Sequence, residues 1–211
     1  MIHDLEKYAE MWASVGEEEV MKMNMELAER RDFTVEDIEK LPDGMRAELI
    51  DGQIFYFASP KEIHQRIGGE LHYRIRDYIE KNKGNCRVYY APFAVKLVED
   101  GKNYLEPDMV VICDKKKIES DGCHGAPDLV IEIVSKSTRK RDYGIKVLKY
   151  RTAGVKEYWV VDPVKETVMV WWFEDESKNC LYGMRDEIEF HLFPGLKVQL
   201  MEVENWMDDV K

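Results

Sequence analysis

The chain has 211 residues, and its content of 45% hydrophobic and 11% aromatic residues is ample for the core of one domain with an extension. Its formal net charge of −11 argues against a uniformly basic nucleic-acid binder, because phosphates repel acidic surfaces. The four cysteines form no CxxC pair and no run of about 18 apolar residues occurs, so we expect neither a disulfide framework, a zinc ribbon nor a membrane segment, and a cytoplasmic location.

The charge is unevenly distributed along the chain. Residues 1–51 contain 15 acidic and 6 basic side chains, whereas the remainder contains 27 acidic and 25 basic ones. Residues 136–151 contain a single acid, Asp142, among seven basic side chains: Lys136, Arg139, Lys140, Arg141, Lys146, Lys149 and Arg151. This segment is a candidate phosphate-facing surface, although a solvated basic helix face has the same composition.

The N-terminal part predicts helices followed by a hairpin. Residues 1–31, rich in Met and Glu, indicate an acidic helical extension, and residues 32–211 form the predicted domain. Thr34 to Asp37 resembles a capped helix start, and that helix should end near Leu41-Pro42. Asp51-Gly52 is a strong hairpin turn signal.

The remaining elements predict a mixed sheet flanked by helices, an α/β (α+β) fold. An aliphatic stripe at helical spacing predicts a long helix over Pro60–Lys83, formed by Ile63, Ile67, Leu71, Ile75 and Ile79. A second helix should span Arg141–Ala153 and end at Gly154. Strands are expected at Arg87–Lys96, Leu105–Cys113, Leu129–Val134, Glu157–Val161, Val168–Phe173 and His191–Gln199, with a loop at 114–126.

Two of these strands each carry one carboxylate in an apolar run. Asp108 lies in YLEPDMVVI and Glu132 in PDLVIEIVSKST. A buried carboxylate loses hydration unless a partner compensates it, and a divalent cation shared by adjacent strands is a common compensation. Alternatively, Asp108 caps a turn and Glu132 pairs with Lys96 or another basic group across the sheet.

These segments, in their order, resemble the PD-(D/E)XK nuclease superfamily. Within it, the chain is similar to a bacterial family of candidate restriction endonucleases labelled Uma-two, from about Phe33 to Phe173. The resemblance rests on FTVEDIEKLP, AELIDGQI, SPKEIHQRI, EPDMVVI, EIVSKST and DYGIKVLKYRTAGVKEYWVVDP. It implies a restriction-endonuclease-like fold and a metal-dependent nuclease.

One position departs from the superfamily pattern, which implies a lysine where this chain has Val134. Lys146 is the favoured replacement, because Asp142, Lys146 and Tyr150 share one helix face and the resemblance allows a lysine from the following helix. An exposed Asp142–Lys146 ion pair is the alternative interpretation. Lys136 is the rival lysine if the strand continues, although hydroxyl residues after Val134 favour a turn.

The resemblance also implies roles for Glu48 and His64. Glu48 matches an acidic position that joins the metal site, although an exposed strand glutamate would look the same. His64 matches a position that often carries histidine, and a single histidine at a helix start is more often a surface or packing residue.

The resulting hypothesis is a nuclease acting on nucleic acid, and the resemblance implies DNA as the substrate. Asp108, Glu132, the Ile133 carbonyl and Glu48 would hold Mg²⁺, with Mn²⁺ able to substitute, and Lys146 would act on the attacking water or the phosphate. Substrate contacts are expected from Lys136, Arg139, Lys140, Arg141 and Tyr150. A homodimer is expected, since two symmetric sites suit two strands. The alternatives are an inactive nucleic-acid-binding or protein-binding module on a nuclease scaffold, and an interaction module whose acidic helices bind a basic protein.

Overall fold

The computed structural model describes residues 18, 22, 30, 32–42, 44–97 and 101–200. The helices predicted within residues 1–31 lie almost entirely outside the described residues, so the domain boundary near residue 32 stays a prediction. None of the helices in the described part of the chain combines the length and apolar character needed to cross a bilayer.

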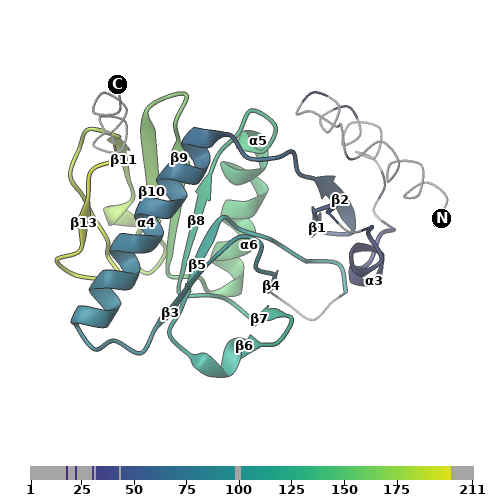
Figure 1. Ribbon diagram of the computed structural model, residues 1–211, viewed down its shortest axis with the longest axis horizontal. Coiled ribbons are helices and arrows are strands. Elements are labelled where there is room, and N and C mark those ends of the chain that lie inside the picture. Colours follow the sequence, from purple (N-terminus) through teal and green to yellow (C-terminus); the bar gives the residue numbers. More distant parts are fainter. Residues whose placement is uncertain are drawn as a thin grey trace.

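A six-stranded mixed sheet forms the centre of the molecule (Figure 1). The neighbours β8 and β9 run parallel, and the other neighbours run antiparallel. This architecture confirms the predicted mixed sheet. In spatial order the strands are β11 (Cys180–Gly183), β10 (Thr167–Trp172), β9 (Glu157–Asp162), β8 (Leu129–Ile133), β5 (Met109–Ile112) and β3 (Arg87–Tyr90).

Each face of the sheet carries its own apolar core, because successive strand residues point to opposite faces. Helix α4 (Glu62–Lys81) crosses one face (Figure 1), where its buried aliphatic stripe packs with Leu129 and Ile131 of β8. Helix α6 (Ile145–Ala153) covers the other face, where it packs near Val130. The predicted helix is therefore confirmed, and its aliphatic stripe forms the buried side of α4.

A smaller unit precedes α4. Helix α3 (Val35–Glu39) begins at Thr34, whose backbone N–H donates to Asp37 Oδ2 at 2.8 Å. Strands β1 (Ala47–Ile50) and β2 (Gln53–Tyr56) form an antiparallel hairpin. Its turn residues Asp51 and Gly52 both have positive φ, 50° and 74°, as a tight hairpin turn requires. The predicted capped helix and hairpin are both confirmed.

The strand predicted over Arg87–Lys96 is wrong, because it is divided between two sheets. After β3 ends at Tyr90, the chain passes Pro92, which has no N–H to donate to a ladder, and re-forms as β4 (Val95–Lys96). The predicted loop 114–126 contains the 3₁₀ turn η2 (Lys115–Lys117) and the hairpin of β6 (Ile118–Glu119) and β7 (Gly122–His124). Strands β4, β7 and β6 form a separate small sheet.

Two further predictions differ from the structure. The helix predicted over Arg141–Ala153 is broken at Gly144 into α5 (Arg139–Asp142) and α6. The strand predicted over His191–Gln199 is mostly turn, because Pro194-Gly195 reverses the chain between β12 (Ile188–Glu189) and β13 (Lys197–Val198). Strand β11 and the 3₁₀ turn η3 (Glu176–Lys178) were not predicted.

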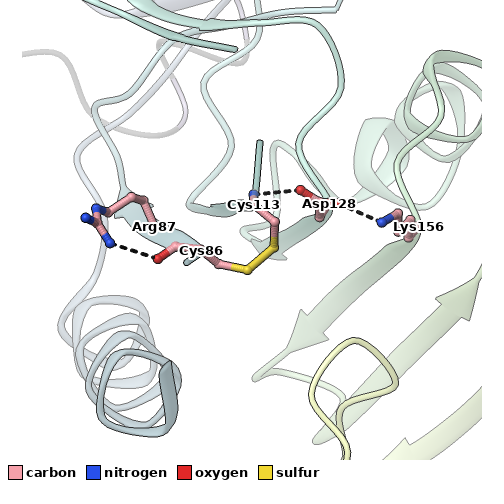
Figure 2. The surroundings of a disulfide bond; sticks show 5 residues. All are labelled: Cys86, Arg87, Cys113, Asp128 and Lys156. Atoms are coloured by element: carbon pink, nitrogen blue, oxygen red, sulfur yellow. Dashed lines mark hydrogen bonds and ion pairs between the residues drawn. A yellow bond between two sulfur atoms is a disulfide. The ribbon is translucent and has the colours of Figure 1, made fainter. Parts of the chain in front are cut away.

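The expected absence of a disulfide is wrong. Cys86 and Cys113 form an S–S bond across β3 and β5 (Figure 2). The pairing of Arg87 with Ile112 brings these cysteines face to face although 27 positions separate them. Local cysteine spacing cannot reveal a cross-strand pair of this kind. Cys123 and Cys180 are free.

Candidate active site

A cavity of about 420 Å³ opens where the start of α4, the approach to β5 and the end of β8 meet. Side chains from segments far apart in the sequence line it, which is the usual arrangement of a ligand site. The ionisable groups among the lining residues are Arg46, Lys61, His64, Glu106, Asp108, Glu132, Lys136, Arg139 and Lys146.

Asp108 lies immediately before β5 and bonds to the neighbouring strand. Its Oδ2 accepts a hydrogen bond from the Ile133 backbone N–H at 2.7 Å. The same oxygen lies 3.1 Å from Nε2 of His64, in the first turn of α4. Asp108 therefore connects β8 and α4 at one wall of the cavity.

The imidazole of His64 lies beside Asp108 and the backbone of Ile133, two of the predicted metal ligands. Burial disfavours its charged form, but the hydrogen bond and charge of Asp108, with a hydrogen bond to the Ile133 backbone, outweigh burial and raise the pKa of His64. This position of the cavity therefore favours positive charge.

Glu132 is the buried carboxylate of β8. Alternation along the strand turns it away from α4 and toward α6, where its Oε1 accepts hydrogen bonds from Lys146 Nζ and the Tyr150 hydroxyl, each at 2.9 Å. The alternative pairing with Lys96 is wrong, because Lys96 Nζ binds Asp121 Oδ2 at 2.7 Å.

Lys146 extends from α6 into a group of carboxylates and is only 1% exposed. Its Nζ lies 2.7 Å from Glu48 Oε1, 2.9 Å from Glu132 Oε1 and 3.3 Å from Asp142 Oδ1. Burial lowers the pKa of Lys146, but these three carboxylates outweigh burial and raise it above the ordinary value. The interpretation of an exposed ion pair is wrong.

Glu48 is fully buried in β1, so the interpretation of an exposed strand glutamate is also wrong. Its Oε1 accepts from the Glu106 backbone N–H at 3.2 Å and faces Lys146. Its Oε2 is buried without a hydrogen-bond partner among the described residues. Glu48 does not line the cavity itself.

The carboxylates around Lys146 carry more negative charge than one ammonium neutralises. Burial raises the pKa of Glu132 and of Asp142, and Lys146 opposes that shift in both cases. Burial, with the charges of Glu132 and Glu48, also raises the pKa of Tyr150. The cluster therefore favours an additional proton or cation.

The basic segment after β8 is only partly available to a ligand. Strand β8 ends at Ile133, and Lys136 lies in the exposed turn beyond it. Lys140 is exposed as well. Arg139 donates to Asp162 Oδ1 at 2.6 Å, and the Arg141 guanidinium lies 4.5 Å from the centre of the Phe55 ring.

The predicted substrate contact of Tyr150 is wrong. This side chain is fully buried and its hydroxyl is bound to Glu132. Helical spacing correctly places Tyr150 on the same face as Lys146, but the hydroxyl points toward the carboxylate cluster and not toward solvent.

Glu106 is a cavity residue that the sequence analysis did not single out. Its Oε2 accepts from Arg46 Nε at 2.8 Å, so the pair joins the hairpin to the segment leading into β5. The only signal in the sequence is its position two residues before Asp108.

In the described part of the chain, one trio of acidic and imidazole side chains brings its ligand atoms within 4.8 Å of one another. It consists of Glu119, Asp121 and His124, in the β6–β7 hairpin and outside the lining of the cavity. Lys96 and His124 already bind the two oxygens of Asp121. The predicted set of Glu48, Asp108 and Glu132 does not converge to this spacing, since Lys146 lies between Glu48 and Glu132.

A mixed sheet carrying Asp108 before one central strand and Glu132 in the next is consistent with a PD-(D/E)XK nuclease in which the lysine comes from the following helix. Residues 35–201 match the Uma2 family, described as "Putative restriction endonuclease". The match spans most of the chain, so the chain belongs to this family. The resemblance inferred from the sequence motifs is confirmed.

The proteins to which the chain is similar include a protein of Synechocystis and one of Anabaena variabilis. The uncharacterized protein slr1290 of Synechocystis is 29% identical over 145 residues, which span 67% of this chain and 75% of that protein. A crystal structure from Anabaena variabilis, described as a "putative nuclease belonging to DUF820", superposes with a TM-score of 0.66. It is 22% identical and covers 83% of this chain and 99% of its own, so it shows the shared fold.

Proposed function

We propose that this protein is a metal-dependent endonuclease that hydrolyses phosphodiester bonds, with DNA as substrate. The observation that carries the proposal is the meeting of Asp108, Glu132 and Lys146 at one cavity, from three separate elements of a chain that belongs to a family described as restriction endonucleases.

The residues of the cavity fit a hard divalent cation such as Mg²⁺. Carboxylate and carbonyl oxygens are the ligands that Mg²⁺ prefers, and one or two carboxylates suffice because the ion keeps several waters. Asp108, Glu132 and the Ile133 carbonyl would hold it, and Glu48, which does not line the cavity and pairs with Lys146, stays outside this ligand set. When bound, such an ion lowers the pKa of a bound water and offsets charge on the phosphate.

The remaining side chains hold the site in position. Lys146 offsets part of the charge of the cluster and, because it lines the cavity, would stabilise charge that develops on the phosphate oxygens. Glu48, Asp142 and Tyr150 position Lys146 and Glu132 through the contacts described above. Lys136, at the rim, would contact a flanking phosphate.

We also propose a homodimer, because two symmetric sites are suited to the two strands of a duplex. Light scattering at micromolar concentration tests this state, and a monomer would contradict it without affecting the proposed chemistry.

The activity is tested by nicking of supercoiled plasmid in Mg²⁺ or Mn²⁺, with EDTA as control. The wild type should nick the plasmid, and Asp108→Asn should abolish nicking. Asp121→Asn is the matched control, because Asp121 belongs to the Glu119–His124 trio outside the cavity.

Loss of nicking in Asp121→Asn but not in Asp108→Asn would contradict the proposed site and would place the metal at the trio of Glu119, Asp121 and His124 instead. Wild-type protein that binds DNA without nicking it would favour an inactive binding module on this scaffold, a reading supported by Val134 at the expected lysine position.

A further inference from the structure

A second hollow, of about 300 Å³, adjoins the candidate active site. The two share five lining residues: His64, Gln65, Ala91, Asp108 and Ile133. The second hollow extends along α4 and adds Gly68, Gly69, His72 and Tyr90. We call these four residues the α4–Tyr90 hollow. A group bound there would lie next to Asp108.

Two consecutive glycines in the middle of the twenty-residue helix α4 form the floor of this hollow. Glycine is among the least favourable residues in a helix interior, so a pair of them needs a reason. A Cβ at Gly69 would meet nothing within 4 Å, and one at Gly68 would make only an ordinary contact of 3.5 Å with Ile133. Close packing within the protein therefore does not require Gly69, and its missing side chain leaves the floor open.

An exposed aromatic ring stands at the side of this floor. Tyr90 ends β3, lines the hollow and is 63% exposed, so its ring is available to a ligand. Alternation along β3 places it on the same side as Val88, which packs against the core under α4. Its ring lies 5.0 Å from that of His72 in an edge-to-face arrangement. Partial burial and the charge of Arg76 lower the pKa of His72, which favours a neutral ring.

The backbone fixes Tyr90 relative to the candidate active site. Tyr90 pairs with Met109 at the start of β5, and the Ala91 N–H donates to the carbonyl of Asp108 at 3.0 Å. The aromatic wall and the proposed metal ligand are thus held by the same pair of strands.

A hollow lined by two glycines, the exposed ring of Tyr90 and the half-buried ring of His72 has the chemistry that recognises a nucleobase. Bases stack on aromatic side chains with little sequence preference, whereas a paired base inside a duplex cannot reach such a ring. We propose that the α4–Tyr90 hollow binds an unpaired nucleobase adjacent to the phosphate at Asp108. The inference rests on the proposed nuclease function and deepens it: the substrate is single-stranded, or locally unpaired, at the cleavage site.

Binding of a short fluorescent oligonucleotide, measured by anisotropy in EDTA, tests the subsite without any need for cleavage. Tyr90→Ala should weaken binding of the single strand by about tenfold or more, the range of one lost base–aromatic stack. Tyr90→Phe should keep the affinity. Tyr73→Ala is the matched control, because Tyr73 is also 63% exposed and lies on α4 outside the hollow.

A second variant fills the hollow without removing a contact. Gly69→Leu places a good helix former in open space, so its melting temperature should equal or exceed that of wild type while its affinity for the single strand falls. This opposite movement of stability and affinity distinguishes a binding floor from a purely structural glycine.

Equal affinities for Tyr90→Ala and Tyr73→Ala, or unchanged affinity in Gly69→Leu, would overturn the subsite. The plasmid assay judges hydrolysis separately. If binding depends on Tyr90 but the wild type does not nick the plasmid, the subsite is kept and the nuclease function is rejected. If the wild type nicks the plasmid in a metal-dependent way but Tyr90→Ala does not weaken binding, the nuclease function is kept and the subsite is rejected.

Discussion

Nζ of Lys146 lies 2.9 Å from Oε1 of Glu132, although the lysine belongs to α6 and the glutamate to β8. In this chain the apolar Val134 takes the strand position at which the superfamily pattern implies a lysine, and it is buried in the core under α6. The helix that covers this core supplies the ammonium instead. Lys146 is therefore both a structural counter-ion and the proposed charge-stabilising group.

Replacing Lys146 by Met should reduce both stability and activity. The change leaves Glu48, Glu132 and Asp142 buried without their shared cation, and breaking a buried ion pair in this way costs about 3–5 kcal/mol. Urea denaturation should show a loss of this size, and plasmid nicking should disappear.

Lys149→Met is the control for the lysine variant, because Lys149 lies on the same helix and pairs with the exposed Asp51. It should change the free energy of unfolding by less than about 1 kcal/mol. The double variant Lys146→Met with Glu132→Gln should recover part of the lost stability, since one buried charge is removed. Strictly additive losses in the double variant would contradict a coupled cluster.

Glu157 should make the stability of the protein depend on pH. Its two oxygens accept hydrogen bonds from Trp159, His191 and Leu192, but burial outweighs these donors and raises the pKa of Glu157 above its ordinary 4.5. A raised folded-state pKa means that the stability contributed by this group is fully present below about pH 4.5 and is lost as the pH rises through the folded-state value.

Glu157→Gln removes this titration and serves to measure it. The free energy of unfolding of the wild type, minus that of the variant, should fall as the pH rises from about 4 toward neutrality. Guanidinium denaturation at a series of pH values measures the difference. A difference that grows with pH would mean that the three N–H donors outweigh burial, and the pKa direction would then be wrong.

The sequence predicts those parts of the fold whose signals are local. The aliphatic spacing of α4 and the Asp51-Gly52 turn each depend on neighbouring residues, and both predictions are confirmed. The Cys86–Cys113 bond depends on which strands pair, which no local pattern encodes. Short elements such as β6 and β12, of two residues each, carry too few positions for a periodic signal.

The candidate site could be predicted as a set of residues, but its internal geometry could not. Helical spacing places Lys146 and Tyr150 on one face, and the structure brings both to Glu132. Their full burial follows from the packing of the β1–β2 hairpin and α6 around the cluster, which is a tertiary effect. The α4–Tyr90 hollow was missed for the same reason, because Gly69 and Tyr90 meet only through the packing of α4 on β3.

The basic segment after β8 should divide into two functional groups. Lys136 and Lys140 are exposed, so changing either to Ala should weaken DNA binding and lower the salt dependence by about one phosphate contact, with no change in melting temperature. Arg139→Ala instead removes the guanidinium partner of the fully buried Asp162, so it should lower the melting temperature. Binding titrations over a range of salt concentrations, with thermal melts, separate the two. Equal melting temperatures for all three variants would mean that the ion pair of Arg139 with Asp162 does not stabilise the fold.

Reduction of the disulfide should lower stability and leave the site intact. The bond closes a loop across 27 positions, for which the entropic model gives about 3.5 kcal/mol of stabilisation. The double variant Cys86→Ser with Cys113→Ser should lose that amount in urea and become insensitive to dithiothreitol, whereas Cys180→Ser should behave as wild type because Cys180 is free.

Asp108 precedes β5 and Cys113 follows it, so the two lie at opposite ends of the strand and plasmid nicking below the unfolding transition should persist after reduction. A loss of nicking without loss of folded protein would show instead that the bond controls the geometry at Asp108.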